Sequence, residues 1–280
     1  MNENLGLVLE NVTASYRNGT VGLKNASFKV NVGSIAALVG VNGAGKSTVF
    51  KSIMGILPCD SGRIRIFGQP VKKALRENIV SYVPQAEDVD WNFPVLVNDL
   101  VMMGRYGQMN WLRLPSSEDK RQVSMALERV GMQDFRGRQI GELSGGQRKR
   151  VFLARALAQK SKLILLDEPF SGVDLKTEDK IIEVLKDIKK KGALIVVATH
   201  NLGSVQQFCD HTILVKETIL AYGPTKTTFN RRNLELAFGG VLRHFVLGGT
   251  QLHDDEDKRK VTVISDDERP LVIYSEEDTK

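Results

Sequence analysis

Two short glycine-rich stretches are the residues of this sequence best suited to hold an anion. The first is "GVNGAGKST", from Gly40 to Thr48, which fits the pattern G-x-x-x-x-G-K-[ST] and lies between an apolar run and a helical pattern. In such a loop, backbone N–H groups converge on phosphate oxygens near the positive end of the following helix. The second is "LSGGQ", from Leu143 to Gln147, much further along the chain. A single chain with two such places requires an explanation.

The first loop predicts a site for a nucleoside triphosphate. We expect Lys46 to reach the β- and γ-phosphates and the Ser47 hydroxyl to bind magnesium. A glycine turn with an idle lysine is the alternative, and the strand–loop–helix context argues against it. The residues expected to contact ATP are Gly40, Val41, Asn42, Gly43, Ala44, Gly45, Lys46, Ser47 and Thr48.

Two adjacent carboxylates follow another apolar run, in "LILLDEP". Asp167 ends the run, so it is expected to emerge at the edge of the sheet where the phosphate loop lies and to bind magnesium. Glu168 is not needed for the metal, but hydrolysis needs a group that orients and deprotonates water. The alternative is a turn that merely ends a strand. The presence of a matching phosphate loop favours the catalytic interpretation.

The second loop has a structural explanation that is incomplete. Ser144 and Gln147 have the spacing of a capping box at the start of a helix, "GGQRKRVFLARALAQ". A helix cap does not call for Gly145 and Gly146, because glycine lowers helix propensity. Paired glycines behind a capping serine expose N–H groups to an approaching anion. A local phosphate site is already furnished by Gly40 to Ser47.

The remaining patterns predict an α/β protein with a parallel sheet. Short apolar runs without alternation, at 35–39, 163–167 and 193–199, are typical of strands buried on both faces. Alternating stretches near the amino terminus and "GRIRIFG" predict further strands. Helical patterns lie between the runs, one of them opening with Ser116 and Asp119 in capping-box spacing. Strands that alternate with helices imply an α/β core.

Three regions differ in character along the chain. We expect one main domain over 5–248, with a helical insertion over about 90–145 that has no convincing strand. The segment 249–280 is a charged tail, in which "VTVI" and "PLVIY" have the composition of a small hairpin. A loosely attached tail is the simpler interpretation, and metal sensing by His253 is the weaker alternative.

Composition limits the class of protein. The chain has 280 residues, 42% hydrophobic and 26% charged, which is typical of a folded soluble protein. The sequence shows no run long enough to span a bilayer and no secretion signal. Two cysteines make no disulfide framework and indicate a reducing compartment. The net charge of +6 suits phosphates, nucleic acid or an anionic membrane, and it does not choose among them.

Five stretches in a fixed order resemble one family. "GVNGAGKST", "LSGGQRKR", "LILLDEP", "SGVD" and "VVATH" look like the ATPase subunit of an ABC transporter, and the resemblance covers about residues 5 to 248. It implies the P-loop ABC ATPase fold, in which a parallel-sheet core carries an antiparallel β subdomain and a helical subdomain. It also implies a head-to-tail dimer, in which each LSGGQ completes the ATP site of a second copy. The partner's ATP is then the anion that the second loop awaits.

The resemblance assigns roles to further residues. Tyr16 resembles the aromatic residue that stacks on adenine, with an ordinary strand aromatic as the alternative. Gln85 resembles the glutamine that senses magnesium and the attacking water, so the magnesium ligands implied are Ser47, Gln85 and Asp167. His200 resembles the histidine that contacts the γ-phosphate, although a strand-end histidine alone is more often structural. The contacts implied with the partner's site are Ser144, Gly145, Gly146, Gln147 and Asp174. Lys149 stands where many relatives have glutamine, a departure expected to matter little.

A narrower resemblance concerns the cargo. "DVDWNFPV", "VMMGRYG" and "NLELAFGGVLRHFVLGG" look like the ATPases of bacterial uptake systems for manganese, iron or zinc, and most like the manganese and chelated-iron branch. This resemblance implies integral permease subunits, an associated metal-binding protein, and a peripheral place on the cytoplasmic face of the plasma membrane. The stretch 87–107 suits either a satellite core or a docking groove for a partner helix, through Trp91, Phe93, Met102, Met103 and Tyr106.

Other functions are less consistent with the sequence. A DNA-maintenance ATPase of related type has long coiled coils between its phosphate loop and LSGGQ, and this stretch shows no heptads. A translation ATPase normally has two such cassettes in one chain, and we therefore expect no nucleic-acid partner. "CDH" at 209–211 lacks a second ligand cluster, which argues against a metal role there.

Overall fold

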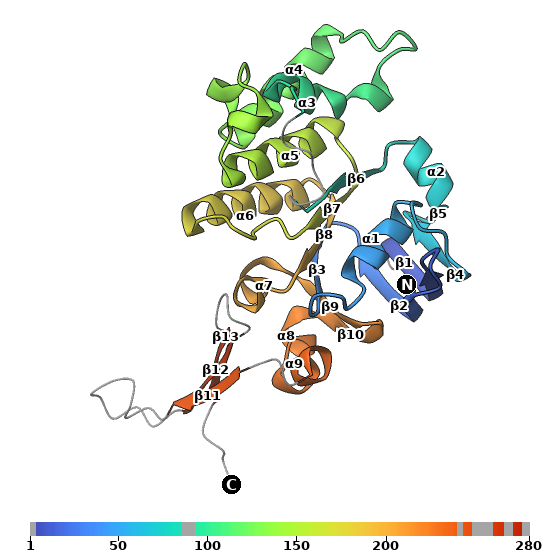
Figure 1. The fold of residues 1–280 in the computed structure, drawn as a ribbon, viewed down its shortest axis with the longest axis vertical. Coiled ribbons are helices and arrows are strands. Elements are labelled where there is room, and N and C mark those ends of the chain that lie inside the picture. The colour runs from blue at the N-terminus through green and yellow to red at the C-terminus, as the bar shows by residue number, and fades with distance from the viewer. Residues whose placement is uncertain (1–3, 86–92, 240–242, 248–259, 266–270, 276–280) are drawn as a thin grey trace.

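The computed structural model describes residues 4–85, 93–239, 243–247, 260–265 and 271–275, and its centre is a six-stranded sheet (Figure 1). The strand order is β10-β9-β3-β8-β7-β6. All neighbours from β9 to β6 pair in parallel, and β10 alone joins antiparallel to β9. The strands are β3 (Ile35–Val39), β6 (Val80–Val83), β7 (Leu163–Asp167), β8 (Leu194–Thr199), β9 (His211–Lys216) and β10 (Thr218–Pro224).

The apolar runs of the central strands are buried on both faces, as predicted. In β3, Ala36 and Leu38 face one hydrophobic cluster, while Ile35, Ala37 and Val39 face another. Strands β7 and β8 divide their side chains between the same two clusters. In a strand that is buried on both faces no side chain reaches water, so apolar residues are favoured at every position. This explains the continuous apolar runs.

One face of the central sheet is covered by α1 (Lys46–Ile53) and a second, antiparallel sheet (Figure 1). This sheet has the order β2-β1-β4-β5 and confirms the strands predicted near the amino terminus. The short α2 (Val71–Arg76) follows it. The strands of this second sheet are β1 (Leu5–Ser15), β2 (Val21–Asn31), β4 (Ser61–Ile66) and β5 (Gln69–Pro70).

The other face packs against α5 (Gly145–Gln159) and α6 (Leu175–Lys190), with the helical insertion beyond α5 (Figure 1). The predicted capping boxes are present at Ser116 and at Ser144. The buried Arg105 guanidinium donates to Asp119 at 2.9 Å and to the Ala158 carbonyl at 2.9 Å, which ties the insertion to α5. The insertion contains α3 (Val97–Met103), η2 (Tyr106–Gln108), α4 (Ser117–Arg129), η3 (Gln133–Phe135) and η4 (Ile140–Glu142).

The chain ends in short helices and a separate three-stranded sheet. The helices are α7 (Leu202–Phe208), α8 (Thr225–Thr228) and α9 (Arg231–Phe238). The predicted hairpin of the tail is present as β12 (Lys260–Ser265) and β13 (Leu271–Ser275). A third strand, β11 (Arg243–Leu247), was not predicted, and it pairs antiparallel with β12 across the expected domain limit at residue 248. Among the described residues no helix combines the length and apolar character needed to cross a bilayer.

Candidate nucleotide site

The functional residues gather where the parallel strands end. The chain leaves β3 into the Gly40 loop, β6 toward Gln85, β7 at Asp167 and β8 toward His200. Because β6, β7, β8 and β3 are neighbours and parallel, their carboxyl ends meet at one edge of the sheet. This edge is where ligands bind in open α/β sheets.

The phosphate loop takes a conformation that its glycines permit. Gly45 has φ +106 at the amino end of α1, and a Cβ there would lie 2.7 Å from the Gly22 carbonyl. Two residues of the predicted loop face inward and do not line the cleft. A Cβ on Gly40 would lie 2.4 Å from the Val215 carbonyl oxygen, and Ala44 is buried. The rest of the predicted loop lines the cleft.

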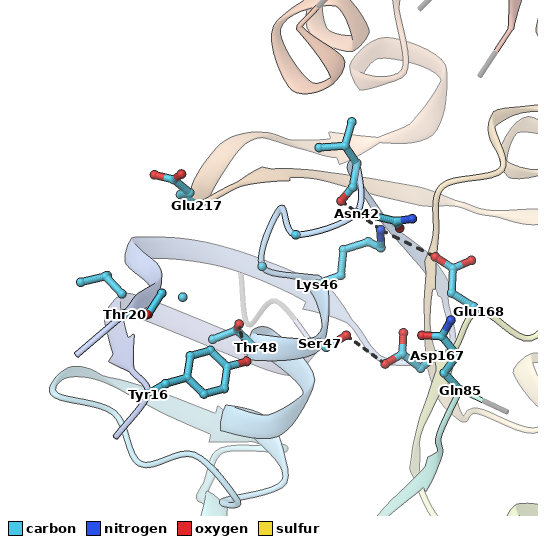
Figure 2. Close-up of a pocket in the computed structure, with 15 residues that line it drawn as sticks. Tyr16, Thr20, Asn42, Lys46, Ser47, Thr48, Gln85, Asp167, Glu168 and Glu217 are labelled. Carbon is cyan, nitrogen blue, oxygen red and sulfur yellow. Dashed lines mark hydrogen bonds and ion pairs between the residues drawn. The ribbon is translucent and has the colours of Figure 1, made fainter. Parts of the chain in front are cut away.

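Lys46 is buried at the base of this loop. Its Nζ donates to the Gly40 carbonyl at 2.6 Å and to the Val41 carbonyl at 3.2 Å. The same atom lies 3.6 Å from Glu168 Oε1, an ion pair shown in Figure 2. Burial lowers the Lys46 pKa, and the charges of Glu168 and Asp167 act in the opposite direction. An ammonium held in this way favours an anionic ligand at the loop.

Ser47 and Asp167 lie together, as their predicted role requires. The Ser47 hydroxyl donates to Asp167 Oδ2 at 3.3 Å, and the Tyr82 hydroxyl donates to the same oxygen at 3.2 Å. Gln85 lines the same cleft beside Asp167 (Figure 2). Burial raises the Asp167 pKa, while the hydrogen bond from Tyr82 lowers it. Hydroxyl, carboxylate and amide oxygens are the hard ligands that magnesium prefers.

Glu168 and His200 form a pair beside Lys46. His200 Nδ1 lies 2.9 Å from Glu168 Oε1, and the Glu168 side chain is buried while that of His200 is partly exposed. His200 does not line the cleft itself but contacts Glu168, which does. Its predicted contact with the γ-phosphate stays a prediction.

The wall opposite the carboxylates is formed by Tyr16 and the residues after it. The Tyr16 hydroxyl shares a hydrogen bond with Thr48 Oγ1 at 3.0 Å, so its ring stands against the phosphate loop (Figure 2). Sequence reasoning missed the neighbouring wall residues Thr20, Val21 and Gly22, which carry no motif.

Glu217 was also missed. It reaches the cleft because its N–H donates to the Ala44 carbonyl at 2.8 Å.

These residues enclose one cleft of about 560 Å³. A volume of this size falls in the range of small-molecule and cofactor sites. Its lining residues are Tyr16, Thr20, Val21, Gly22, Val41, Asn42, Gly43, Gly45, Lys46, Ser47, Thr48, Gln85, Asp167, Glu168 and Glu217.

The LSGGQ turn lies outside this cleft. Ser144 Oγ accepts from the Gln147 N–H at 3.3 Å, and the Gln147 side chain accepts from the Ser144 N–H at 2.9 Å. Ser144 and Gly145 are exposed, and a Cβ on Gly145 would meet nothing within 4 Å. The capping box is therefore present, and the position beside Gly145 is open to an approaching group.

Asp174 also has a local structural role. It caps α6 by accepting from the Thr177 N–H at 2.9 Å and from the Thr177 hydroxyl at 2.8 Å. The hydrogen bond from the Thr177 hydroxyl, with that from its N–H, lowers the Asp174 pKa. Asp174 is exposed, and its predicted contact with a partner stays a prediction.

Three further predicted features lie outside the cleft. Of the residues suggested for docking, Met102 is buried, whereas Phe93 and Tyr106 are 60% and 39% exposed, so the stretch contributes to both a core and a surface. Asp210 accepts from the Ile35 N–H at 2.8 Å and from Lys189, which gives it a structural role. The described residues contain no cluster of metal-binding side chains. Trp91 and His253 lie outside the described residues.

Comparison with known proteins places these features in one family. The model of the ABC transporter family matches residues 23–171. The chain is 62% identical to the "Chelated iron transport system membrane protein YfeB" of Yersinia pestis, over 96% of this chain and 90% of that protein. It is 57% identical to the "Manganese transport system ATP-binding protein MntA" of Synechocystis, over 85% and 91%. It is 41% identical to the "Zinc transport system ATP-binding protein TroB" of Treponema pallidum, over 90% and 93%.

Solved structures agree with this placement. An inward-facing metal-chelate type ABC transporter matches with a TM-score of 0.76 and 28% identity, over 96% of this chain and 98% of that one. The dimeric structure of a bacterial ABC transporter cassette matches with a TM-score of 0.69 and 26% identity, over 78% and 98%. The P-loop ABC ATPase fold predicted from the sequence is thereby confirmed.

Proposed function

Because this chain belongs to the ABC transporter family, as an ATP-hydrolysing subunit, we propose that it drives the import of a transition metal, manganese or iron. The observation that carries the choice of cargo is the 62% identity to a chelated-iron transport protein over nearly the whole chain. Zinc is the alternative cargo, favoured by the 41% identity to a zinc transport ATPase.

We infer that Glu168 activates the water that attacks the γ-phosphate. Glu168 Oε1 lies 2.9 Å from His200 Nδ1 and 3.6 Å from Lys46 Nζ, so two cationic or hydrogen-bonding groups orient one carboxylate. The carboxylate accepts the proton of the water as the bond from water oxygen to phosphorus forms and the bond to the leaving phosphate oxygen breaks. His200 fixes the direction in which Glu168 points.

Lys46 and the Ser47–Asp167 pair hold the triphosphate. Lys46 Nζ already binds oxygen atoms at the loop, and phosphate oxygens are acceptors of the same kind with more charge. Ser47, Asp167 and Gln85 offer oxygen ligands on one side of the cleft, which fits magnesium. Magnesium, when bound, offsets negative charge on the phosphates.

The site is completed by a second copy of this chain. The exposed Ser144 and the open position beside Gly145 suit an anion, and the chain's own cleft lies elsewhere. Ser144, Gly145, Gly146 and Gln147 of each copy face the ATP of the other, with Asp174 at the contact between them. A dimer seen for a structurally similar cassette supports this arrangement.

We propose that the transport pathway is formed by other subunits, because a structurally similar chain belongs to a metal-chelate type ABC transporter. We propose that integral permease subunits dock against Gln85 and the helical insertion, in which Phe93 and Tyr106 expose aromatic surface. The chain then lies on the cytoplasmic face of the plasma membrane. A metal-binding protein delivers the cargo from the other side.

Uptake by the purified complex tests this function. The chain, purified from membranes together with the integral subunits that accompany it, is reconstituted in vesicles and supplied with Mn²⁺, Fe²⁺ or Zn²⁺. We expect ATP-dependent uptake of manganese or iron, and we expect Glu168→Gln to bind ATP but not to support uptake. Uptake confined to zinc would overturn the choice of cargo, and normal uptake by Glu168→Gln would overturn the role of Glu168.

A further inference from the structure

Glu168 has an unusual backbone conformation for a side chain that must point accurately. Its φ is +48, in the left-handed region that residues other than glycine rarely adopt. Its N–H donates to the Ala198 carbonyl on β8 at 3.0 Å. Because φ and ψ set the direction of the Cα–Cβ bond, whatever holds this conformation also aims the carboxylate at His200 and Lys46.

The other backbone group of Glu168 is bound by Lys149. The Lys149 ammonium, from the second turn of α5, donates to the Glu168 carbonyl at 3.1 Å. It also donates to the Ser171 carbonyl. One cation therefore joins two carbonyls of the loop between β7 and α6. Hydrogen bonds from a charged donor are stronger than neutral ones, and Lys149 is half-buried, which limits competition from water.

The same loop touches α5 at a second point. A Cβ on Gly146 would lie 3.5 Å from Val173 Cγ1 and 3.6 Å from Thr177 Cγ2, so the first turn of α5 already packs closely against the end of the loop. The LSGGQ turn and Lys149 belong to one helix. A displacement of that helix therefore reaches the Glu168 backbone through Lys149.

We propose that Lys149 is a positioning residue, which holds Glu168 in its left-handed conformation and couples the LSGGQ turn to the water-activating carboxylate. This inference rests on the proposed role of Glu168. It gives a specific task to a residue whose difference from the glutamine of many relatives was expected to matter little. Approach of the partner's ATP to the LSGGQ turn of one chain is then felt at the carboxylate of that same chain.

Three substitutions in the full chain separate positioning from simple stability. Lys149→Met keeps the length of the side chain and removes its donors. We expect its turnover at saturating ATP to fall roughly ten- to hundredfold, because small misplacements of a catalytic group have effects of this size. Its affinity for a fluorescent ATP analogue is expected to change less than about twofold, because Lys149 does not line the nucleotide cleft. Lys149→Gln keeps N–H donors and is expected to recover most of the turnover.

The matched control is Lys186→Met, the same change at an exposed lysine of α6, which is expected to behave as the parent. Parent-like turnover in Lys149→Met would overturn the inference. A loss that lies in ATP affinity, or one that Lys149→Gln does not recover, would overturn it too.

A double substitution distinguishes this inference from the role of Glu168 itself. If Lys149 acts through Glu168, Lys149→Met should cause no further loss in a Glu168→Gln background, because the two changes remove the same step. Normal turnover in Glu168→Gln alone would remove the proposed base. If Glu168→Gln is strongly impaired and its residual single-turnover rate falls further on adding Lys149→Met, Glu168 keeps its role as base and the positioning role of Lys149 is overturned.

Discussion

The wall of the cleft formed by Tyr16 depends on the absence of a side chain at Gly22. A Cβ there would lie 2.7 Å from Thr48 Oγ1, 2.8 Å from Tyr16 Cε2 and 3.0 Å from Thr48 Cγ2. Gly22 does not have a positive φ, so alanine at this position is strained by contact alone. Tyr16 and Thr48 are joined by a hydrogen bond of 3.0 Å, and neither can yield without moving the other.

Gly22→Ala is therefore expected to displace the Tyr16 wall. Restoring ordinary contacts of about 3.4 Å or more requires shifts of about 0.6–0.7 Å at both neighbours. Overpacking of this kind costs about 1–3 kcal/mol. If Tyr16 moves away to relieve this strain and must return when ATP binds, the same cost lowers the affinity for ATP by about 5- to 150-fold. Turnover at saturating ATP should change little, because Glu168 lies on the opposite wall.

Titration of a fluorescent ATP analogue, together with steady-state hydrolysis, measures both quantities. Gly137→Ala is the matched control, because a Cβ at Gly137 would meet nothing within 4 Å. Adding Thr48→Ala removes two of the three close contacts, so the double variant should bind ATP nearly as well as Thr48→Ala alone. Parent-like affinity in Gly22→Ala, with Tyr16 in place, would refute the reasoning about this wall.

Two further predictions concern buried carboxylates. Burial raises the Asp167 pKa, so its charge destabilises the folded chain increasingly as the pH rises through the interval between its unfolded and folded pKa values. Asp167→Asn should therefore unfold at a higher temperature than the parent at pH 7, by about 2–4 °C per kcal/mol recovered, and the difference should shrink toward pH 4. The variant should show no magnesium-dependent hydrolysis. An unfolding temperature below that of the parent at pH 7 would contradict this prediction. Asp119→Asn should lose about 3–5 kcal/mol in denaturant unfolding at pH 7, because Arg105 keeps a buried charge. Hydrogen bonds from Ser116 hold the Asp119 pKa below its usual range, so the parent should lose the stabilisation by ionised Asp119 as the pH falls below about 4. Equal stability of Asp119→Asn and the parent at pH 7 would exclude this stabilisation.

The local features of the fold were predictable because they depend on short stretches of sequence. The run at 35–39 shows its burial on both faces, and Ser116 and Ser144 show their capping boxes. The spacing of its glycines and its position between a strand and a helix identify the phosphate loop in the sequence. Each of these signals lies within a few residues, so tertiary packing had little opportunity to override it.

The missed features depend on pairings between distant segments. Gly22 and Glu217 reach the cleft only because β2 and the turn after β9 pack beside the phosphate loop, and neither belongs to a motif. Tyr82 binds Asp167 across neighbouring strands, and β6 itself is a short strand with a polar residue at Ser81. The contact of Lys149 with Glu168 likewise depends on how α5 packs on the loop after β7. Such contacts are fixed by register and packing, which local patterns do not encode.

Mixing two inactive variants tests the shared site most directly. Lys46→Ala removes the phosphate-binding lysine, and Ser144→Arg blocks the LSGGQ turn. In a mixed dimer, the intact Lys46 of one chain faces the intact Ser144 of the other. Single-turnover ATP hydrolysis by an equal mixture should recover to about a quarter of the parent's amplitude, because random pairing of two chains restores that share of the sites. No recovery on mixing, with mixed dimers shown to form, would contradict a site built from two copies.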